Sequence, residues 1–482
     1  MLKPVELIMA NITAPINKRS TRGNILLWSM YDLANTVFSM GIVSLTVIKF
    51  FTLLGMQQGL SWSESNFLAG LAGSISTIFV ALTIPFMGAI SDKSGERKSK
   101  VVLLGVLCIL STGIVYFFVN FWIAFFLFII ANITYQWGNL FYDAMIPHIC
   151  AEDEIGKVSA TGVAIGYVGS FIAIAILFIL PFVGILDHTP LREDGVPLSA
   201  PIEEGGIPIS FDQIVLGEFQ WMWLICALAF LITAIPFLWV TERTKKETHS
   251  TSSVVKSAFS ELKITTREVV TYRDMLFFMI GWILTVDVVN TIIAYMLPAA
   301  EDAWGLSGTM PLILIFVGVI GASVLTLAIG PVSDKQGPKM AFLIVGVGYL
   351  FTLVIAVLAD TNDPSLGGVW LVLLFIAALI IGGAQGSTWV ANRQMVIELA
   401  PEDKVGQYFG FSKLVSKGGS AIGMSIFAAV LSITQEITGS IPTSYRVGFI
   451  VLGVIYIIGL FFLMLVKDHH KDYLAGKRAP FD

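Results

Sequence analysis

The chain has 482 residues, of which 56% are hydrophobic and only 13% are charged, and its formal net charge is −5. Soluble domains average about 45–50% apolar and about 25% charged residues, so this composition excludes a soluble enzyme, a nucleic-acid-binding protein and a disordered scaffold. The mean hydropathy of +0.82 predicts an all-α membrane protein whose helices face lipid.

Twelve apolar segments are long enough to cross a membrane as helices, because one span needs about 20 apolar residues. Strict alternation of polar and apolar residues is absent from these segments, which argues against a transmembrane β-barrel. In chain order the predicted spans cover residues 24–54, 65–90, 100–118, 121–147, 158–186, 219–241, 275–299, 308–332, 339–359, 367–396, 408–433 and 445–466.

The basic residues predict how the chain is oriented and divided. Lysine and arginine gather before the first span and after every second span, and basic loops stay on the cytoplasmic side, so both termini are expected to be cytoplasmic. The acidic segment 187–218 is expected to be an external loop. We predict an N-terminal six-helix bundle in residues 1–241, a cytoplasmic linker in 242–274 and a C-terminal six-helix bundle in 275–482.

Short motifs recur in the two halves in the same order and in equivalent spans or loops. Any one of these similarities could arise by chance, but three in the same order indicate an internal repeat. The matched segments are 32–36 and 287–291, 88–98 and 330–339, and 152–156 and 402–406.

The longest of these motifs contains an aspartate four residues after a glycine, followed by a second glycine and basic residues. The leading glycine permits close approach of helices, and the second suits a tight turn. The aspartate can pair with a basic residue or face a helix N-terminus. A basic turn without any gating role would explain the same residues.

This duplicated motif resembles the signature of the major facilitator superfamily, whose two six-helix halves form a parallel repeat. The resemblance implies twelve transmembrane helices in two pseudo-symmetric bundles. It also implies that the motif latches the halves together on the cytoplasmic side, with Asp92 at the start of the eleventh span and Asp334 at the start of the fifth. The expected cytoplasmic gate consists of Gly88, Asp92, Gly95, Arg97, Asp334, Gly337 and Lys339.

Other motifs resemble the vacuole-effluxer family of that superfamily. They are Tyr-Asp-Leu-Ala-Asn-Thr-Val-Phe in 31–38, Phe-Tyr-Asp-Ala-Met-Ile-Pro in 141–147, the glycine-rich start of the fifth span in 158–169, and Phe-Gly in 409–410. That family includes autophagy-related vacuolar amino-acid effluxers and many bacterial relatives. The resemblance implies a multi-pass protein of a bacterial inner membrane.

Two carboxylates inside predicted spans are the strongest site candidates, since charged groups in lipid are costly and usually functional. Asp32 and Asp287 occupy matching positions in the first and seventh spans, which line the central cavity in this superfamily. Both are expected to bind a cationic or amino group or to carry the proton that couples transport. A structural hydrogen bond to a neighbouring helix is the alternative for each.

Uncharged polar side chains complete the predicted site. Some follow the two carboxylates by three or four residues and so share their helix faces, although contacts between helices would also explain them. Others come from the fourth and tenth spans, which are unusually polar. The predicted members are Asn35, Asn290, Thr291, Tyr135, Gln136 and Gln385.

Three further ionisable residues are weaker candidates. Asp143 is expected to pair with basic residues at the start of the third span, Arg97 among them, rather than to bind a ligand. Arg393 lies near the cytoplasmic end of the tenth span and is a candidate for either the site or the gate. Lys417 is expected to snorkel, to pair with Asp92 or to take part in the site.

These features predict a secondary active transporter of small polar solutes, amino acids first, with proton coupling and alternating access. An exporter of lipophilic or cationic compounds and a sugar transporter are the alternatives. The sequence has no P-loop, nucleophile elbow or metal-binding motif, so we expect neither an enzyme nor any cofactor or metal. The expected partners are the solute, protons and the lipid bilayer, with no nucleic acid, and the chain is expected to be a monomer.

Overall fold

The computed structural model describes residues 21–94, 97–179, 216–243, 264–306, 310–361 and 365–479. Ten helices in this part are long and apolar enough to cross a membrane. Many large apolar side chains face outward, such as Leu82 and Ile437, which are 75% and 79% exposed. Such surfaces require lipid rather than water around them, so the fold is that of an all-α membrane protein.

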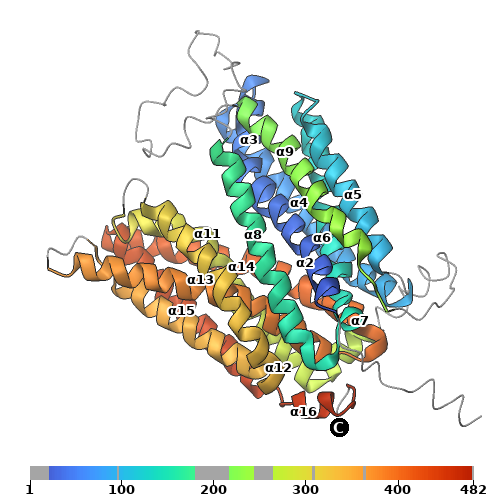
Figure 1. Cartoon of the computed structure of the whole chain (residues 1–482). Helices are drawn as coiled ribbons and strands as arrows, with labels where there is room; N and C mark the ends of the chain where they lie inside the picture. Colours follow the sequence, from blue (N-terminus) through green and yellow to red (C-terminus); the bar gives the residue numbers. More distant parts are fainter. Residues whose placement is uncertain are drawn as a thin grey trace, which may run out of the picture.

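The helices form two bundles, which correspond to the two halves of the chain (Figure 1). The first contains α2 (Arg22–Phe38), η1 (Ser39–Thr46), α3 (Val47–Gln57), α4 (Trp62–Ser94), α5 (Arg97–Val115), α6 (Phe121–Ala144), α7 (Ile146–Ile149), η2 (Glu152–Glu154), α8 (Ile155–Ile179), α9 (Leu216–Ala234) and η5 (Ile235–Trp239). The second contains α11 (Arg273–Asp302), α12 (Met310–Leu358), α13 (Gly367–Leu399), η6 (Glu402–Lys404), α14 (Val405–Thr438), α15 (Ile441–Leu465) and α16 (His470–Leu474).

Most helix ends follow local sequence signals. The Asn120 side chain accepts a hydrogen bond from the backbone N–H of Ile123 and caps α6, and Ser440 caps α15 through the N–H of Thr443 in the same way. Gly439, with a φ of +66°, ends α14 in the left-handed conformation that glycine adopts without strain. Short polar turns therefore place successive helices antiparallel to one another.

Two predicted spans share one continuous element. α12, Met310–Leu358, contains two helices that correspond to the predicted spans 308–332 and 339–359 and are joined at Gly337, whose φ of +84° is not helical. A side chain would be strained there, as expected from the predicted turn. Residues 244–263 of the predicted linker 242–274 lie outside the described residues, so its boundaries stay predictions. Residues 187–215 of the expected external loop also lie outside the described residues.

The first predicted span is not one regular helix. Between α2 and α3 the chain forms the π-helix η1, where Gly41 packs against Cys226 of α9. A Cβ atom on Gly41 would lie 2.6 Å from the Cys226 sulfur. π-turns are frequent at functional sites, and Ser39 and Ser44 of this turn line the cavity described below.

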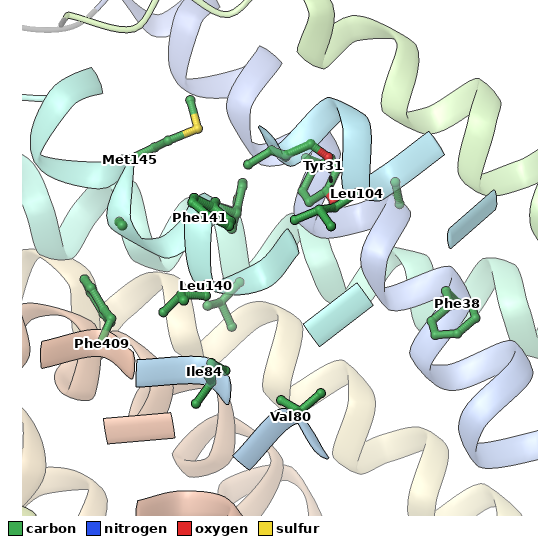
Figure 2. Close-up of a cluster of buried hydrophobic side chains, with 14 of the residues drawn as sticks. Tyr31, Phe38, Val80, Ile84, Leu104, Leu140, Phe141, Met145 and Phe409 are labelled. Atoms are coloured by element: carbon green, nitrogen blue, oxygen red, sulfur yellow. Dashed lines mark hydrogen bonds between the residues drawn. The ribbon is translucent and has the colours of Figure 1, made fainter. Parts of the chain in front are cut away.

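One buried hydrophobic cluster joins the two bundles. Figure 2 shows Phe409 of α14 in the same cluster as Ile84 of α4 and Leu140 and Phe141 of α6. Phe409 and Ile84 are each 1% exposed. Phe409 lies in the first turns of α14. The two bundles therefore pack together near the helix ends that adjoin the repeated motifs. We call this side of the molecule, with Asp92, Gly156, Asp334 and Gly406, the motif end.

Candidate functional site

A cavity of about 450 Å³ lies between the two bundles. Its walls come from α2, η1, α4, α6 and α8 of the first half and from α11, α13 and α14 of the second. Of the residues predicted from the sequence, those that line it are Asp32, Tyr135, Gln136, Asn290 and Gln385, together with the weaker candidates Asp143, Arg393 and Lys417.

Buried charges from the two bundles meet in this cavity. The carboxylates Asp32 of α2 and Asp143 of α6 face the cations Arg393 of α13 and Lys413 of α14. Arg393 Nη2 lies 2.9 Å from Asp143 Oδ1 and 3.5 Å from Asp32 Oδ2, and Lys413 Nζ lies 2.6 Å from Asp143 Oδ2. All three ion pairs join one half to the other, so separating the bundles around the cavity would break them.

Aromatic rings hold Arg393 in position. Tyr142 stacks on Trp28 with ring centroids 4.3 Å apart and an interplanar angle of 5°, and the guanidinium carbon lies 5.8 Å from the Tyr142 centroid. This distance is within the range of a cation–π contact. The planar guanidinium thus has an aromatic face beside it and carboxylates at its edge, an arrangement that a lysine ammonium cannot reproduce.

The glycine-rich start of α8 allows α2 to approach closely. A Cβ on Gly162 would lie 2.6 Å from the Trp28 ring and 3.3 Å from Asp32 Oδ2. A Cβ on Gly169 would overlap the backbone carbonyl of Leu33. Larger residues at these positions would push apart the helix that carries Asp32 and the helix that carries Tyr167, another cavity-lining residue.

Three of the predicted site residues, Asp287, Asn35 and Thr291, are not among the residues that line the cavity. Asp287 is 7% exposed and accepts a hydrogen bond of 3.2 Å from the backbone N–H of Gly423 on α14. The Asn35 side chain donates to Asn139 of α6, and Thr291 is fully buried. The expectation that both repeated carboxylates face the cavity is therefore wrong for Asp287, which makes the structural hydrogen bond weighed as the alternative.

The expected partner of Asp143 is also wrong. Asp143 pairs with Arg393 and Lys413 of the second half, as described above. Arg97 instead pairs with Asp92 at 3.5 Å and with Glu242 at 3.8 Å. The pair was expected because Asp143 and the basic residues of α5 lie at the same predicted end of their spans, but α6 turns Asp143 toward the other bundle.

Some lining residues were not predicted from the sequence. Trp282 of α11 and Trp389 of α13 line the cavity and meet edge to face, with centroids 5.6 Å apart. Trp389 lies one helical turn after Gln385, and this shared face is the signal that could have identified it. Trp282 has no comparable signal, because tryptophan is common in apolar helices at positions that face lipid.

At the motif end, the two repeated aspartates cap helices of the opposite half. Asp92 accepts hydrogen bonds from the backbone N–H groups of Gly406 and Gln407, at 2.7 and 2.9 Å, in the first turn of α14. Asp334 likewise accepts from Gly156 and Lys157 in the first turn of α8, at 2.6 and 2.9 Å. A carboxylate satisfies free N–H groups at a helix N-terminus and interacts favourably with the helix dipole. The structure therefore has the contacts that the repeat predicts.

Glycines bring these helices into backbone contact. A Cβ on Gly88 would overlap the carbonyl oxygen of Gly406 and lie 2.9 Å from the Gln407 Cα. A Cβ on Gly330 would lie 2.9 Å from the carbonyl oxygen of Gly156. The predicted close approach is thus present in both repeats. Gly95 lies outside the described residues.

The C-terminal segment packs onto the motif end. Lys339 donates to the carbonyl of Val466 at 2.7 Å. His470 of α16 is 3% exposed; its Nδ1 lies 2.8 Å from Glu398 Oε1 and its Nε2 lies 2.9 Å from the carbonyl oxygen of Asp334. Because both partners are acceptors, only the doubly protonated imidazolium can donate both hydrogen bonds. His470 therefore supports the backbone of α12 at Asp334, whose carboxylate caps α8.

We expect the stability of the protein to fall as the pH rises through the pKa of His470. Burial lowers this pKa, but the hydrogen bond to Glu398 and the charge of that carboxylate raise it more, so the net pKa lies above its usual value. The stabilisation is fully present below the unfolded pKa of about 6.5 and is lost above the folded pKa. Thermal unfolding of the purified protein should show a loss of about 1.5–3 kcal/mol, and His470→Gln should abolish this pH dependence.

His148→Gln is the matched control for this measurement. Burial is the main reason that the pKa of His148 is lowered to about 3, so His148 is neutral across the whole range tested. Because only the unfolded state protonates this imidazole, below about pH 6.5, the variant should keep the loss of stability that the unsubstituted protein shows above that pH. An unchanged pH dependence in His470→Gln would show that another group causes it.

Comparison with known families identifies two overlapping matches. Residues 211–473 match the family described as vacuole effluxer Atg22 like, and residues 36–298 match the major facilitator superfamily. Each match covers more than half of the 482 residues.

Two similar proteins extend over nearly the whole chain. YxiO of Bacillus subtilis (strain 168), an uncharacterized MFS-type transporter, is 25% identical over 447 residues, which are 92% of this chain and 94% of its own. An uncharacterized protein of Aquifex aeolicus (strain VF5) is 21% identical over 443 residues, or 92% and 96% of the two chains.

Solved structures share the fold. The major facilitator proton:xylose symporter XylE, bound to 6-bromo-6-deoxy-D-glucose, superposes with a TM-score of 0.66 at 13% identity over 92% of this chain and 96% of its own. The transporter FucP in the outward conformation gives 0.61 at 15% identity over 91% and 97%. The family matches and this fold show that the chain is a multi-pass membrane transporter, not an enzyme, and belongs to the major facilitator superfamily and to the vacuole effluxer Atg22-like family.

Proposed function

We propose that this transporter carries small polar solutes, amino acids first, by alternating access and with proton coupling. The single observation that carries the proposal is the array of opposite charges in the cavity, with carboxylates on the first half and cations on the second. An amino acid offers an ammonium to the former and a carboxylate to the latter. The amides of Gln136, Asn290 and Gln385 add neutral donors and acceptors for the rest of a polar solute.

The same array argues against an exporter of lipophilic compounds. Binding sites for apolar molecules are lined mainly by hydrophobic and aromatic side chains. Here Asp32, Asp143, Arg393, Lys413 and Lys417 all line the cavity. An apolar solute that displaced water from these charges could not replace the lost hydrogen bonds. Sugars are the second candidate class because Trp282 and Trp389 offer aromatic faces beside the polar groups.

We further propose that the motif end is cytoplasmic and serves as the gate. Basic residues gather in the segments at that end, which supports this orientation and the proposal that both termini are in the cytoplasm of a bacterial cell. Asp92 and Asp334 then hold the halves together while the cavity faces away from the cytoplasm, and they release the two helix N-termini when the transporter opens inward. The proposed unit is a monomer.

Asp32 is the proposed proton carrier in the cavity. Its contact with Arg393 is the longest of the three ion pairs, and its buried Oδ2 atom accepts no hydrogen bond among the described residues. Opening at the motif end would separate Asp32 from Arg393, because the two residues belong to different halves. A carboxylate that loses its paired cation in a low-dielectric site takes up a proton more readily, which would couple protonation to the change of state.

Uptake of radiolabelled amino acids into proteoliposomes, with and without a pH gradient, tests this function. We expect the gradient to drive accumulation in the unsubstituted protein and in Asp287→Asn, whose amide oxygen can still accept from the N–H of Gly423. Asp32→Asn should lose gradient-driven accumulation but keep exchange of solute between the two sides. Equal gradient-driven accumulation by all three proteins would contradict a coupling role for Asp32. Uptake of xylose without uptake of any amino acid would favour the sugar class.

A further inference from the structure

The charges that line the cavity do not balance. Two carboxylates, Asp32 and Asp143, face three basic side chains, Arg393, Lys413 and Lys417. The three ion pairs described above use both carboxylates, Arg393 and Lys413. Lys417 is left with no hydrogen bond or ion pair in the part of the chain that the structure describes. With every group in its usual charge state, the cavity therefore carries one excess positive charge.

No nearby carboxylate can neutralise Lys417 without losing its own partner. Asp143 already contacts Arg393 and Lys413, and Asp287 of α11 binds the backbone of α14 at Gly423. Lys413, one helical turn before Lys417, adds a repelling positive charge on the same helix. An ammonium group without a counter-ion in a low-dielectric site is unfavourable, and an anion that enters the cavity would remove this cost.

The position of Lys417 suits a solute that also reaches Asp32. Counted from the helix ends at the motif end, Asp32 lies about 15 Å along α2 and Lys417 about 18 Å along α14, at 1.5 Å per residue. Both side chains line the same cavity, one from each half. Among the described residues the Asp32 carboxylate makes one ion pair, the 3.5 Å contact of its Oδ2 atom with Arg393, so the carboxylate can also accept an ammonium group from the cavity. A small molecule with both groups can thus bridge the two bundles at one depth.

We infer that Lys417 is the subsite for a carboxylate of the solute, and that the preferred solute carries one net negative charge. A zwitterion leaves the excess positive charge in place, whereas a solute with a net charge of −1 neutralises the cavity. This inference rests on the proposed transport function and narrows its substrate class from amino acids in general to acidic amino acids. The ammonium group of such a solute lies toward Asp32, and its side-chain or α-carboxylate pairs with Lys417.

Binding to the purified full-length protein, measured by isothermal titration calorimetry, tests this inference with three probes. L-Glutamate has a net charge of −1, L-glutamine has almost the same shape but is neutral, and glutarate has the carboxylates without the amine. We expect L-glutamate to bind about 10- to 100-fold more tightly than L-glutamine, because one hydrogen-bonded charge pair distinguishes them. Lys417→Gln should remove this preference, and Lys417→Arg should restore most of it.

Lys477→Gln is the matched control, because it removes the same charge from a side chain that is 68% exposed and pairs with Asp472 outside the cavity. It should leave all affinities unchanged. If L-glutamine bound as tightly as L-glutamate and Lys417→Gln changed neither, the inference would be wrong while amino-acid transport stood. Binding of glutarate alone, lost in Lys417→Gln, would support the anion subsite and contradict the amino-acid proposal. Binding of none of the probes would overturn both.

Discussion

Replacing Arg393 with glutamine is expected to lower the free energy of unfolding by about 3–5 kcal/mol, the range typical of a buried ion pair that loses one partner. Arg393 is the cation shared by Asp32 and Asp143, and its side chain is 11% exposed. Without it, Lys413 is the one cation among the described residues that still pairs with either carboxylate, and it pairs with Asp143. Denaturation of the purified protein in detergent, followed by circular dichroism, measures the loss.

The matched control for Arg393 is Arg446→Gln. Arg446 also pairs with an aspartate, Asp360, at 3.6 Å, but its side chain is 36% exposed. Pairs of this kind contribute about 0–1 kcal/mol, so the control should unfold almost like the unsubstituted protein. The double variant Arg393→Gln with Asp32→Asn should recover part of the lost stability, since it removes the carboxylate that has lost its paired cation, whereas Asp143 keeps its pair with Lys413. Equal losses in Arg393→Gln and Arg446→Gln would contradict the buried network.

Substituting Gly88 with alanine is expected to hold the motif end open. The added Cβ would overlap the backbone carbonyl of Gly406, which a change of rotamer cannot relieve. Overpacking of this kind costs about 1–3 kcal/mol. It would destabilise only the closed state, in which α4 and α14 are in contact. The ratio of closed to open molecules should therefore drop by about 5- to 150-fold.

A distance between spin labels at Asp153 and Asp403 would measure this shift. Both positions are exposed, and they lie in the repeated loops of opposite halves. The mean distance should lengthen in Gly88→Ala. Gly70→Ala, on the same helix, is the control, because a Cβ at Gly70 meets nothing within 4 Å. A distance in Gly88→Ala that matched the control would show that the backbone contact does not limit closure.

The motif-end contacts could be predicted because local sequence encodes both of their partners. Each aspartate follows a glycine that permits close approach, and each lies opposite a helix start that carries another glycine, Gly406 or Gly156. The same motif stands in both halves, so two-fold pseudo-symmetry alone brings Asp92 and Asp334 to equivalent N–H groups. Which helix start each aspartate meets was implied by the resemblance to the superfamily.

The cavity could be predicted only in part. Polar residues in apolar helices indicated Asp32, Gln136 and Gln385, because a side chain that is costly in lipid must face the interior of the bundle. The pattern could not distinguish a cavity wall from a buried contact between helices. Asp32 and Asp287 occupy equivalent positions in the repeat, yet Asp287 binds the backbone of α14.

The amino-acid sequence by itself determined the membrane spans, the internal repeat and the helix ends, because these follow from apolar length, turn residues and caps close together in the chain. Only the tertiary structure decided which charges pair. Asp143 meets Arg393 and Lys413 although they lie far apart in sequence, and Lys417 has no partner among the described residues, because the rotation of each helix and the packing of the two bundles set these distances. The low charge content thus indicated a membrane protein, while the arrangement of the few buried charges defines the candidate site.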